Sequence, residues 1–144
     1  CNMVHMTNWI LQGIPERFPK LKSVWVESGL AWLPFLMQRL DDQFLMRQSE
    51  APALKMPPSE YMRQHCWFSS QPMEASNPKA LELTFEMINA ESQLLWSSDW
   101  PHFDFDTPRV IYDLPFLSQD AKRNILGRNA QALFNLPDRP AVRT

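Results

Sequence analysis

Residues 94–106 read LLWSSDWPHFDFD, and this segment is the clearest sign of the fold class in the sequence. Its apolar start is typical of a buried strand in a parallel sheet, because such strands are covered on both faces. Polar residues and a proline follow the apolar run, and Asp99 is the first acid among them. In parallel α/β folds the functional groups gather at the carboxyl ends of the strands. We therefore take Asp99 as the first candidate functional residue.

Two earlier segments have the same form. Residues 23–27 (SVWVE) and 66–70 (CWFSS) are short apolar segments that end in polar side chains. With residues 94–98 they are expected to be the three strands of the chain. Glu27 ends the first of them, so its carboxylate is expected at the same edge of the sheet as Asp99.

Helical patterns separate these strands. Residues 33–46 carry apolar side chains at a helical period. Further helices are expected at residues 4–14, from the N-cap Ser59 onward, at 77–89 behind the N-cap Asn77, and at 119–133 behind the N-cap Ser118. Residues 49–58 and the segment that runs through Asp113 are expected to be loops. Strands that alternate with helices predict an α/β fold with a parallel sheet.

The composition indicates a globular domain without a nucleic-acid or membrane partner. The chain has 144 residues, of which 44% are hydrophobic, and a formal net charge of −2. It therefore has no electrostatic reason to bind nucleic acid, and no apolar run reaches the length of a membrane helix. The first residues lack the order of a secretory signal, so a cytoplasmic location is the default expectation. Cys1 and Cys66 are too few and too far apart to indicate a zinc ribbon or a disulfide scaffold.

Three strands are too few to form an independent parallel sheet. Such a sheet needs cover on both faces and protection at both edges. We therefore expect the chain to be part of a larger barrel or to associate with a second copy. It begins with Cys1 and a helical pattern rather than with methionine and a strand, which is expected of a fragment.

Several blocks together resemble a known family. The order of ERFPKLKSVWVESGLAWLP (16–34), SEYMRQHCWFSSQP (59–72), LLWSSDWPHFDFD (94–106) and KRNILGRNAQALF (122–134) resembles the carboxyl-terminal half of the amidohydrolase-related family. That family includes aminocarboxymuconate-semialdehyde and resorcylate decarboxylases and several lactone and ring-cleavage-product hydrolases. The resemblance implies that residues 1–144 are a partial domain of about three βα units, from the carboxyl-terminal part of a TIM-like (β/α)8 barrel.

The resemblance also implies a divalent metal, Zn²⁺ or Mn²⁺. In the family an HxH pair, a further histidine and an aspartate at the end of the last strand hold the ion. Asp99 takes the place of that aspartate, and the earlier ligands would precede residue 1, so the site is expected to be incomplete in this chain. The family often has histidine where this chain has Glu27, and the departure leaves open which residue handles the proton.

Each candidate residue has a functional and a structural interpretation. Asp99 is predicted to bind the metal and act as acid and base, and the alternative is that it caps the following loop. Glu27 is predicted to assist in proton transfer, unless it pairs with Arg39 to fix the rim. His102 is predicted to contact substrate or orient Asp99, or else to bond a backbone carbonyl. In the same loop Asp104 and Asp106 alternate with phenylalanines, which favours a structural role.

Aromatic side chains give a further hypothesis about the pocket. Five tryptophans lie at or beside the strand ends, namely Trp25, Trp32, Trp67, Trp96 and Trp100. They suit a wall for a planar conjugated substrate, although core packing is the more common use of such residues.

These features lead to two classes of function. The first is a metal-dependent hydrolase that acts on a small carboxylated aromatic or its ring-cleavage product, with a decarboxylase of the same family as the alternative. Glu27 in place of histidine favours hydrolysis. The second is a non-catalytic truncated barrel that self-associates. The partners expected are therefore a small-molecule substrate and either a second copy of the chain or an amino-terminal half.

Overall fold

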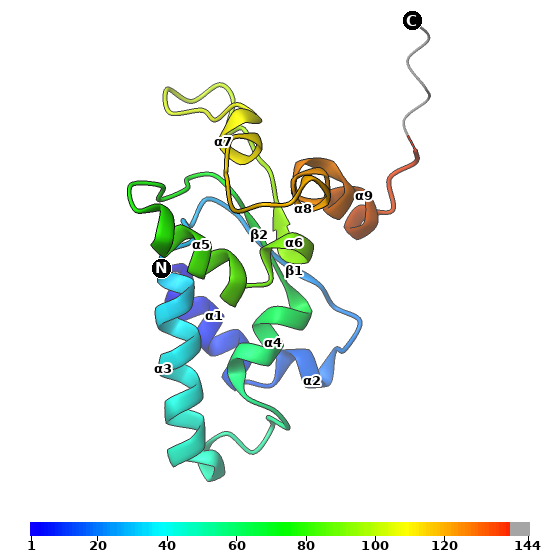
Figure 1. Ribbon diagram of the computed structural model, residues 1–144. Helices are drawn as coiled ribbons and strands as arrows, with labels where there is room; N and C mark the ends of the chain where they lie inside the picture. Colours follow the sequence, from blue (N-terminus) through cyan, green and yellow to red (C-terminus); the bar gives the residue numbers. More distant parts are fainter. Residues whose placement is uncertain (139–144) are drawn as a thin grey trace, which may run out of the picture.

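Three short strands form a parallel sheet in the computed structural model, which describes residues 1–138 of the chain (Figure 1). The strands are β1 (Ser23–Trp25), β2 (Cys66–Ser69) and β3 (Leu94–Leu95), in the order β1-β2-β3. Trp25 pairs with Phe68, and Ser69 pairs with Leu95. The prediction of an α/β fold with a parallel sheet is confirmed. The central strand brings the ends of β1 and β3 to the same edge of the sheet.

Helices precede and follow each strand. They are α1 (Asn2–Leu11), α2 (Ile14–Arg17), α3 (Trp32–Met46), α4 (Pro58–His65), α5 (Pro78–Met87), α6 (Ala90–Gln93), α7 (Arg109–Tyr112), α8 (Gln119–Arg123) and α9 (Asn129–Phe134), with a 3-10 turn at Gln48–Glu50 and a π-helical turn at Asn124–Arg128. α3 packs against α1 and α4, and α8, the π turn and α9 lie beside α6 and β3 (Figure 1). None of the helices within residues 1–138 is long and apolar enough to cross a membrane.

The strands are shorter than predicted. β1 ends at Trp25 rather than Glu27, because Glu27 adopts a left-handed backbone with φ of 53° and cannot continue a strand. β3 ends at Leu95 rather than at residue 98. The Trp96 N–H donates to the Ile125 carbonyl oxygen of the π turn, not to a neighbouring strand. Glu27 and Asp99 therefore lie on turns just past the strands.

Several helix boundaries also differ from the prediction. Ser59 is not an N-cap, because α4 begins at Pro58 and the Ser59 N–H donates to Asp41 Oδ1. The helix expected through residue 89 ends at Met87, where Asn89 turns the chain with φ of 54°. The last expected helix is three segments, α8, the π turn and α9. The predicted loops contain the 3-10 turn and α7, and Gly13, at φ of 65°, separates α1 from α2.

The core lies between the sheet and the helices around it. Apolar side chains of α1, α3, α4, β3 and the π turn are almost completely buried there, among them Met6, Ile10, Leu33, Met37, Met62, Leu94 and Ile125. The capping predictions for α5 and α8 are confirmed, since Asn77 Oδ1 accepts the Ala80 N–H and Ser118 Oγ accepts the Ala121 N–H. This packing fixes the strand ends on which the candidate residues lie.

Candidate metal centre

Glu27, Asp99 and His102 come together at the carboxyl edge of the sheet. A carboxylate oxygen of each acid and an imidazole nitrogen of the histidine all lie within 4.8 Å of one another. Glu27 follows β1, and the two other residues follow β3. The three predicted site residues lie together because the carboxyl ends of parallel strands meet at the same edge of the sheet. The Glu27 carboxylate lies beside the Asp99 carboxylate and the His102 ring.

The turn at Glu27 is held by its neighbours. The Glu27 N–H donates to Ser69 Oγ at the end of β2, over 3.0 Å. Gly29 follows with φ of 70°, and a Cβ there would collide with the Glu74 carboxylate. Glu74 Oε2 accepts the N–H groups of Leu30 and Ala31, at 2.8 and 3.1 Å, at the start of α3. Gly29 therefore makes room for the Glu74 carboxylate, which holds the backbone between Glu27 and α3.

Asp99 and His102 form a tight local pair. Asp99 has φ of 56°, and its Oδ2 lies 2.8 Å from His102 Nδ1. The His102 N–H also donates to the Asp99 carbonyl oxygen, over 2.9 Å. The Trp100 N–H donates to Ser98 Oγ, so Ser98 is the side chain that caps this turn. His102 therefore contacts the Asp99 carboxylate directly, and its predicted role in orienting Asp99 stays a prediction.

The electrostatics of the three groups depend on Asp99. Hydrogen bonding with Asp99, and then its negative charge, raises the pKa of Glu27. Hydrogen bonds with Glu27 and His102 lower the pKa of Asp99. The same contact with Asp99 raises the pKa of His102. Two adjacent carboxylates repel each other, and a nearby positive charge removes that cost.

The three side chains fit a divalent cation. Zinc bonds to carboxylate oxygen and imidazole nitrogen are about 2.0 to 2.2 Å long, so two ligand atoms on one ion lie at most about 4.4 Å apart. A group spread over 4.8 Å reaches that limit through small side-chain rotations. Two carboxylates and an imidazole suit Zn²⁺ and Mn²⁺. They supply three donors, and an octahedral ion has room for more.

A hollow of about 360 Å³ opens beside this centre. It is lined by Gln71, Pro72, Phe103 and Asp104 together with the three candidate residues. Phe103 is 99% exposed and forms the aromatic part of the wall. The hypothesis of a tryptophan wall is wrong for this hollow, since Trp32 lines a neighbouring hollow that Glu27 also lines, and Trp100 packs on Phe105.

Sequence reasoning did not single out the serines that bond the strand ends. Ser69, Ser70 and Ser97 hold neighbouring strand ends through their hydroxyls, and the Gln71 side chain donates to Asp104. The available signal was the run SSQ directly behind an apolar strand. A buried serine at that position needs a hydrogen-bond partner, and the nearest free groups are those of the adjacent strand ends.

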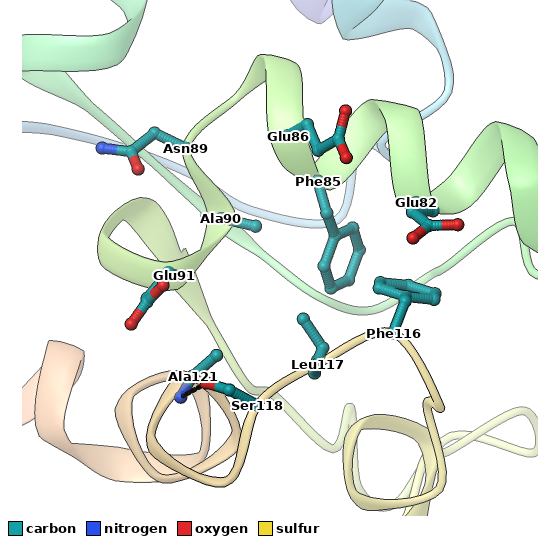
Figure 2. A pocket seen from close by; sticks show the side chains of 10 residues that line it. All are labelled: Glu82, Phe85, Glu86, Asn89, Ala90, Glu91, Phe116, Leu117, Ser118 and Ala121. Carbon is teal, nitrogen blue, oxygen red and sulfur yellow. Dashed lines mark hydrogen bonds between the residues drawn. The ribbon is translucent and has the colours of Figure 1, made fainter.

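A separate hollow of about 300 Å³ lies between α5, α6 and the start of α8 (Figure 2). Phe85 and Phe116 pack edge to face within it, with ring centres 5.5 Å apart. Figure 2 shows Glu82 and Glu86 on the side of these rings, and Glu91 on the opposite side of the hollow. The hollow shares no residue with the candidate metal centre.

Comparison with solved structures gives close matches in fold. The chain is 30% identical to 5-carboxyvanillate decarboxylase from Sphingomonas paucimobilis, with a TM-score of 0.71 over 90% of this chain and 38% of that one. It is 25% identical to an amidohydrolase from Mycobacterium avium subsp. paratuberculosis K-10, with a TM-score of 0.76 over 91% and 32%.

A third structure shares the fold. It is a dihydroxybenzoic acid decarboxylase from Polaromonas sp. JS666 with bound manganese and the inhibitor 2-nitroresorcinol, 23% identical, with a TM-score of 0.69 over 93% and 40%. The chain thus spans less than half the length of these three proteins. No curated protein sequence matches it.

The family model agrees with these structures and with the resemblance found in the sequence blocks. The model for amidohydrolases matches residues 1–136, which is almost the whole chain. The strand-end position of Asp99 and the parallel sheet fit that assignment. The chain belongs to the amidohydrolase family.

Proposed function

We propose that the chain is part of a metal-dependent decarboxylase that acts on a small aromatic carboxylic acid. The observation that carries the proposal is the convergence of Glu27, Asp99 and His102 beside a hollow with an aromatic wall. The 30% identity to a decarboxylase of 5-carboxyvanillate supports this substrate class over the hydrolase substrates that the sequence favoured.

The proposal includes a larger barrel. Residues 1–144 would contribute about three βα units to the carboxyl-terminal part of a (β/α)8 domain. The support is the three-stranded parallel sheet and the coverage of only 32 to 40% of the solved relatives. The other strands, from an amino-terminal segment or a second copy, would cover the edges at β1 and β3.

Asp99, with Glu27 and His102, would hold a Mn²⁺ or Zn²⁺ ion together with ligands from outside this chain. When bound, the ion supplies positive charge that anchors and polarises an acidic substrate. His102 would keep the Asp99 carboxylate aimed at the hollow through the 2.8 Å contact. Phe103 and Pro72 would pack against the substrate ring.

Decarboxylation of an aromatic acid breaks the bond between ring and carboxyl carbon, releases CO₂, and puts a proton on the ring carbon. A proton donor must therefore face the ring. Glu27 and Asp99 both line the hollow, and we assign the delivery of that proton to this pair. Glu27 would be the acid that carries the proton, without binding the ion in that state, while Asp99, held by His102, would remain the ligand.

Hydrolysis of a ring-cleavage product is the second candidate. Glu27 stands where related enzymes often carry histidine, and two neighbouring carboxylates can also accept a proton from an attacking water. The same group of residues would then serve a lactone or a carbonyl compound. A non-catalytic protein would have no use for two neighbouring acids beside a hollow, so we favour an enzyme.

Measurement of turnover distinguishes the decarboxylase from the hydrolase. The full protein, loaded with Mn²⁺, is incubated with 5-carboxyvanillate or 2,6-dihydroxybenzoate, and CO₂ release is followed. A lactone substrate is run in parallel. We expect CO₂ release that falls at least about 100-fold in Asp99→Asn, as for loss of an essential acid-base group, and stays unchanged in Asp113→Asn, which alters an exposed acid of a surface ion pair. Lactone hydrolysis without CO₂ release would favour the second candidate.

A further inference from the structure

We infer that Ser69 and Ser70, at the end of β2, are positioning residues that hold the two acids of the metal centre together. The inference rests on the proposed metal site and adds to it the residues that form its support. Neither serine touches the hollow beside Asp99. Both act through the backbone of the neighbouring strands.

Ser69 holds the turn that carries Glu27. Its side chain is buried, with 6% of the residue exposed, and its Oγ accepts the Glu27 N–H over 3.0 Å. The same hydroxyl donates to the Gln71 carbonyl oxygen over 3.1 Å. Without the Ser69 hydroxyl, the Glu27 N–H and the Gln71 carbonyl oxygen would each lose a hydrogen-bond partner where they are partly shielded from water. Ser69 therefore fixes the backbone from which the Glu27 carboxylate extends.

Ser70 holds the segment that leads to Asp99. It is completely buried, and its Oγ accepts the Ser97 N–H over 3.1 Å. A second hydrogen bond joins the same two segments, because Ser97 Oγ accepts the Gln71 N–H over 3.3 Å. Asp99 is only two residues beyond Ser97. Ser69 therefore bonds the segment that follows β1, and Ser70 bonds the segment that follows β3.

These contacts take over where the sheet ends. Backbone pairing of β2 with β3 reaches Ser69 and Leu95, and the Ser70 N–H to Leu95 carbonyl bond is the last one beyond it. Past this point hydroxyls replace the carbonyl partners. They hold two turns that have no intrinsic preference for their shape, because Glu27 and Asp99 both adopt φ above 50° without being glycine. The two acids also repel each other, so they stay close only if the strand ends are fixed.

Outer groups that orient metal ligands are worth about 10- to 100-fold in metal affinity. We therefore expect Ser69→Ala to raise the Mn²⁺ dissociation constant of the full protein by about that factor, measured by electron paramagnetic resonance titration. The matched control is Ser59→Ala, which removes another buried hydroxyl, at the start of α4, and should leave the constant unchanged. A Ser69→Ala constant within about twofold of wild type would overturn the inference.

A second pair of variants keeps the test valid if Ser69→Ala does not fold. Ser69→Thr and Ser69→Val have nearly the same shape, and only threonine keeps the hydroxyl. We expect the valine variant to bind Mn²⁺ at least about 10-fold more weakly than the threonine variant. Equal binding by the two would contradict a positioning role for the hydroxyl.

Amide hydrogen exchange tests the role of Ser69 independently of the proposed metal site. In wild type the Glu27 amide should be protected, and Ser69→Ala should remove that protection while the amides of β2 stay protected. A wild-type protein that binds no Mn²⁺ would refute the metal site, and the exchange result alone would then decide the role of Ser69. If the Glu27 amide exchanged as slowly in Ser69→Ala as in wild type, the positioning role of Ser69 would be overturned.

Discussion

Replacement of Tyr61 by phenylalanine tests how the amino-terminal segments are joined to the core. Tyr61 is 1% exposed, and its hydroxyl donates to Glu16 Oε1 and accepts the Lys55 N–H, the latter over 2.8 Å. Lys55 also forms an ion pair with Glu16. One phenol oxygen thus joins α2, the loop before α4, and α4 itself.

The expected loss of stability depends on which hydrogen-bond partners remain after the substitution. Tyr61→Phe keeps the ring, so no cavity forms, but it removes one bond to a carboxylate and one to a backbone amide. Glu16 retains Lys55, and the side chain of Glu16 is 20% exposed, so water can replace part of the loss. We therefore expect the free energy of unfolding to fall by about 1 to 2 kcal/mol, toward the low end for bonds to charged groups.

Urea unfolding followed by circular dichroism measures this change. The matched control is Tyr112→Phe, because Tyr112 is 56% exposed on α7 and its ring keeps its contact with Lys122. The control should change stability by less than about 0.5 kcal/mol. Equal stability of Tyr61→Phe and wild type would refute the assigned role of the hydroxyl.

Three further predictions follow from single contacts. Lys55 and then Tyr61, by hydrogen bonding, lower the pKa of Glu16 below its usual 4.5, so this stabilisation is complete above that pH and is lost as the pH falls through the folded pKa. Melting temperatures of Glu16→Gln should therefore fall less than those of wild type between about pH 5 and 3. Burial raises the pKa of Cys66 to about 12, so a thiol reagent should modify Cys1 alone until the chain unfolds. Asn77→Ala removes the cap of α5 and should cost about 1 kcal/mol in urea unfolding, whereas a cost near zero would contradict the capping contact.

Local patterns in the sequence predicted most of the elements. Apolar runs placed the three strands, and the caps Asn77 and Ser118 were correct because capping depends on neighbours a few residues away. The break at Asn124–Arg128 had no such signal, since the apolar period continues through the π turn. There the Ile125 carbonyl accepts the Trp96 N–H, a contact between residues far apart in sequence.

The candidate residues were predictable because the rule for parallel strands is geometric. It placed Glu27 and Asp99 at one edge without any knowledge of loop shape. Their left-handed backbones were not predictable, since residues other than glycine adopt that region uncommonly, although aspartate does so more often than glutamate. The role of Ser69 depends on the pairing of β1 with β2, which no single segment encodes. The catalytic roles, the cytoplasmic location and the association with a second copy stay predictions.

Manganese binding shows whether Asp99 belongs to a metal centre. The full protein is titrated with Mn²⁺, and free ion is measured by electron paramagnetic resonance. We expect about one bound ion per chain. Asp99→Asn should abolish this binding or weaken it at least about 10-fold, and Asp113→Asn should leave it unchanged. An Asp99→Asn protein that binds Mn²⁺ as tightly as wild type would contradict a metal centre at the ends of these strands.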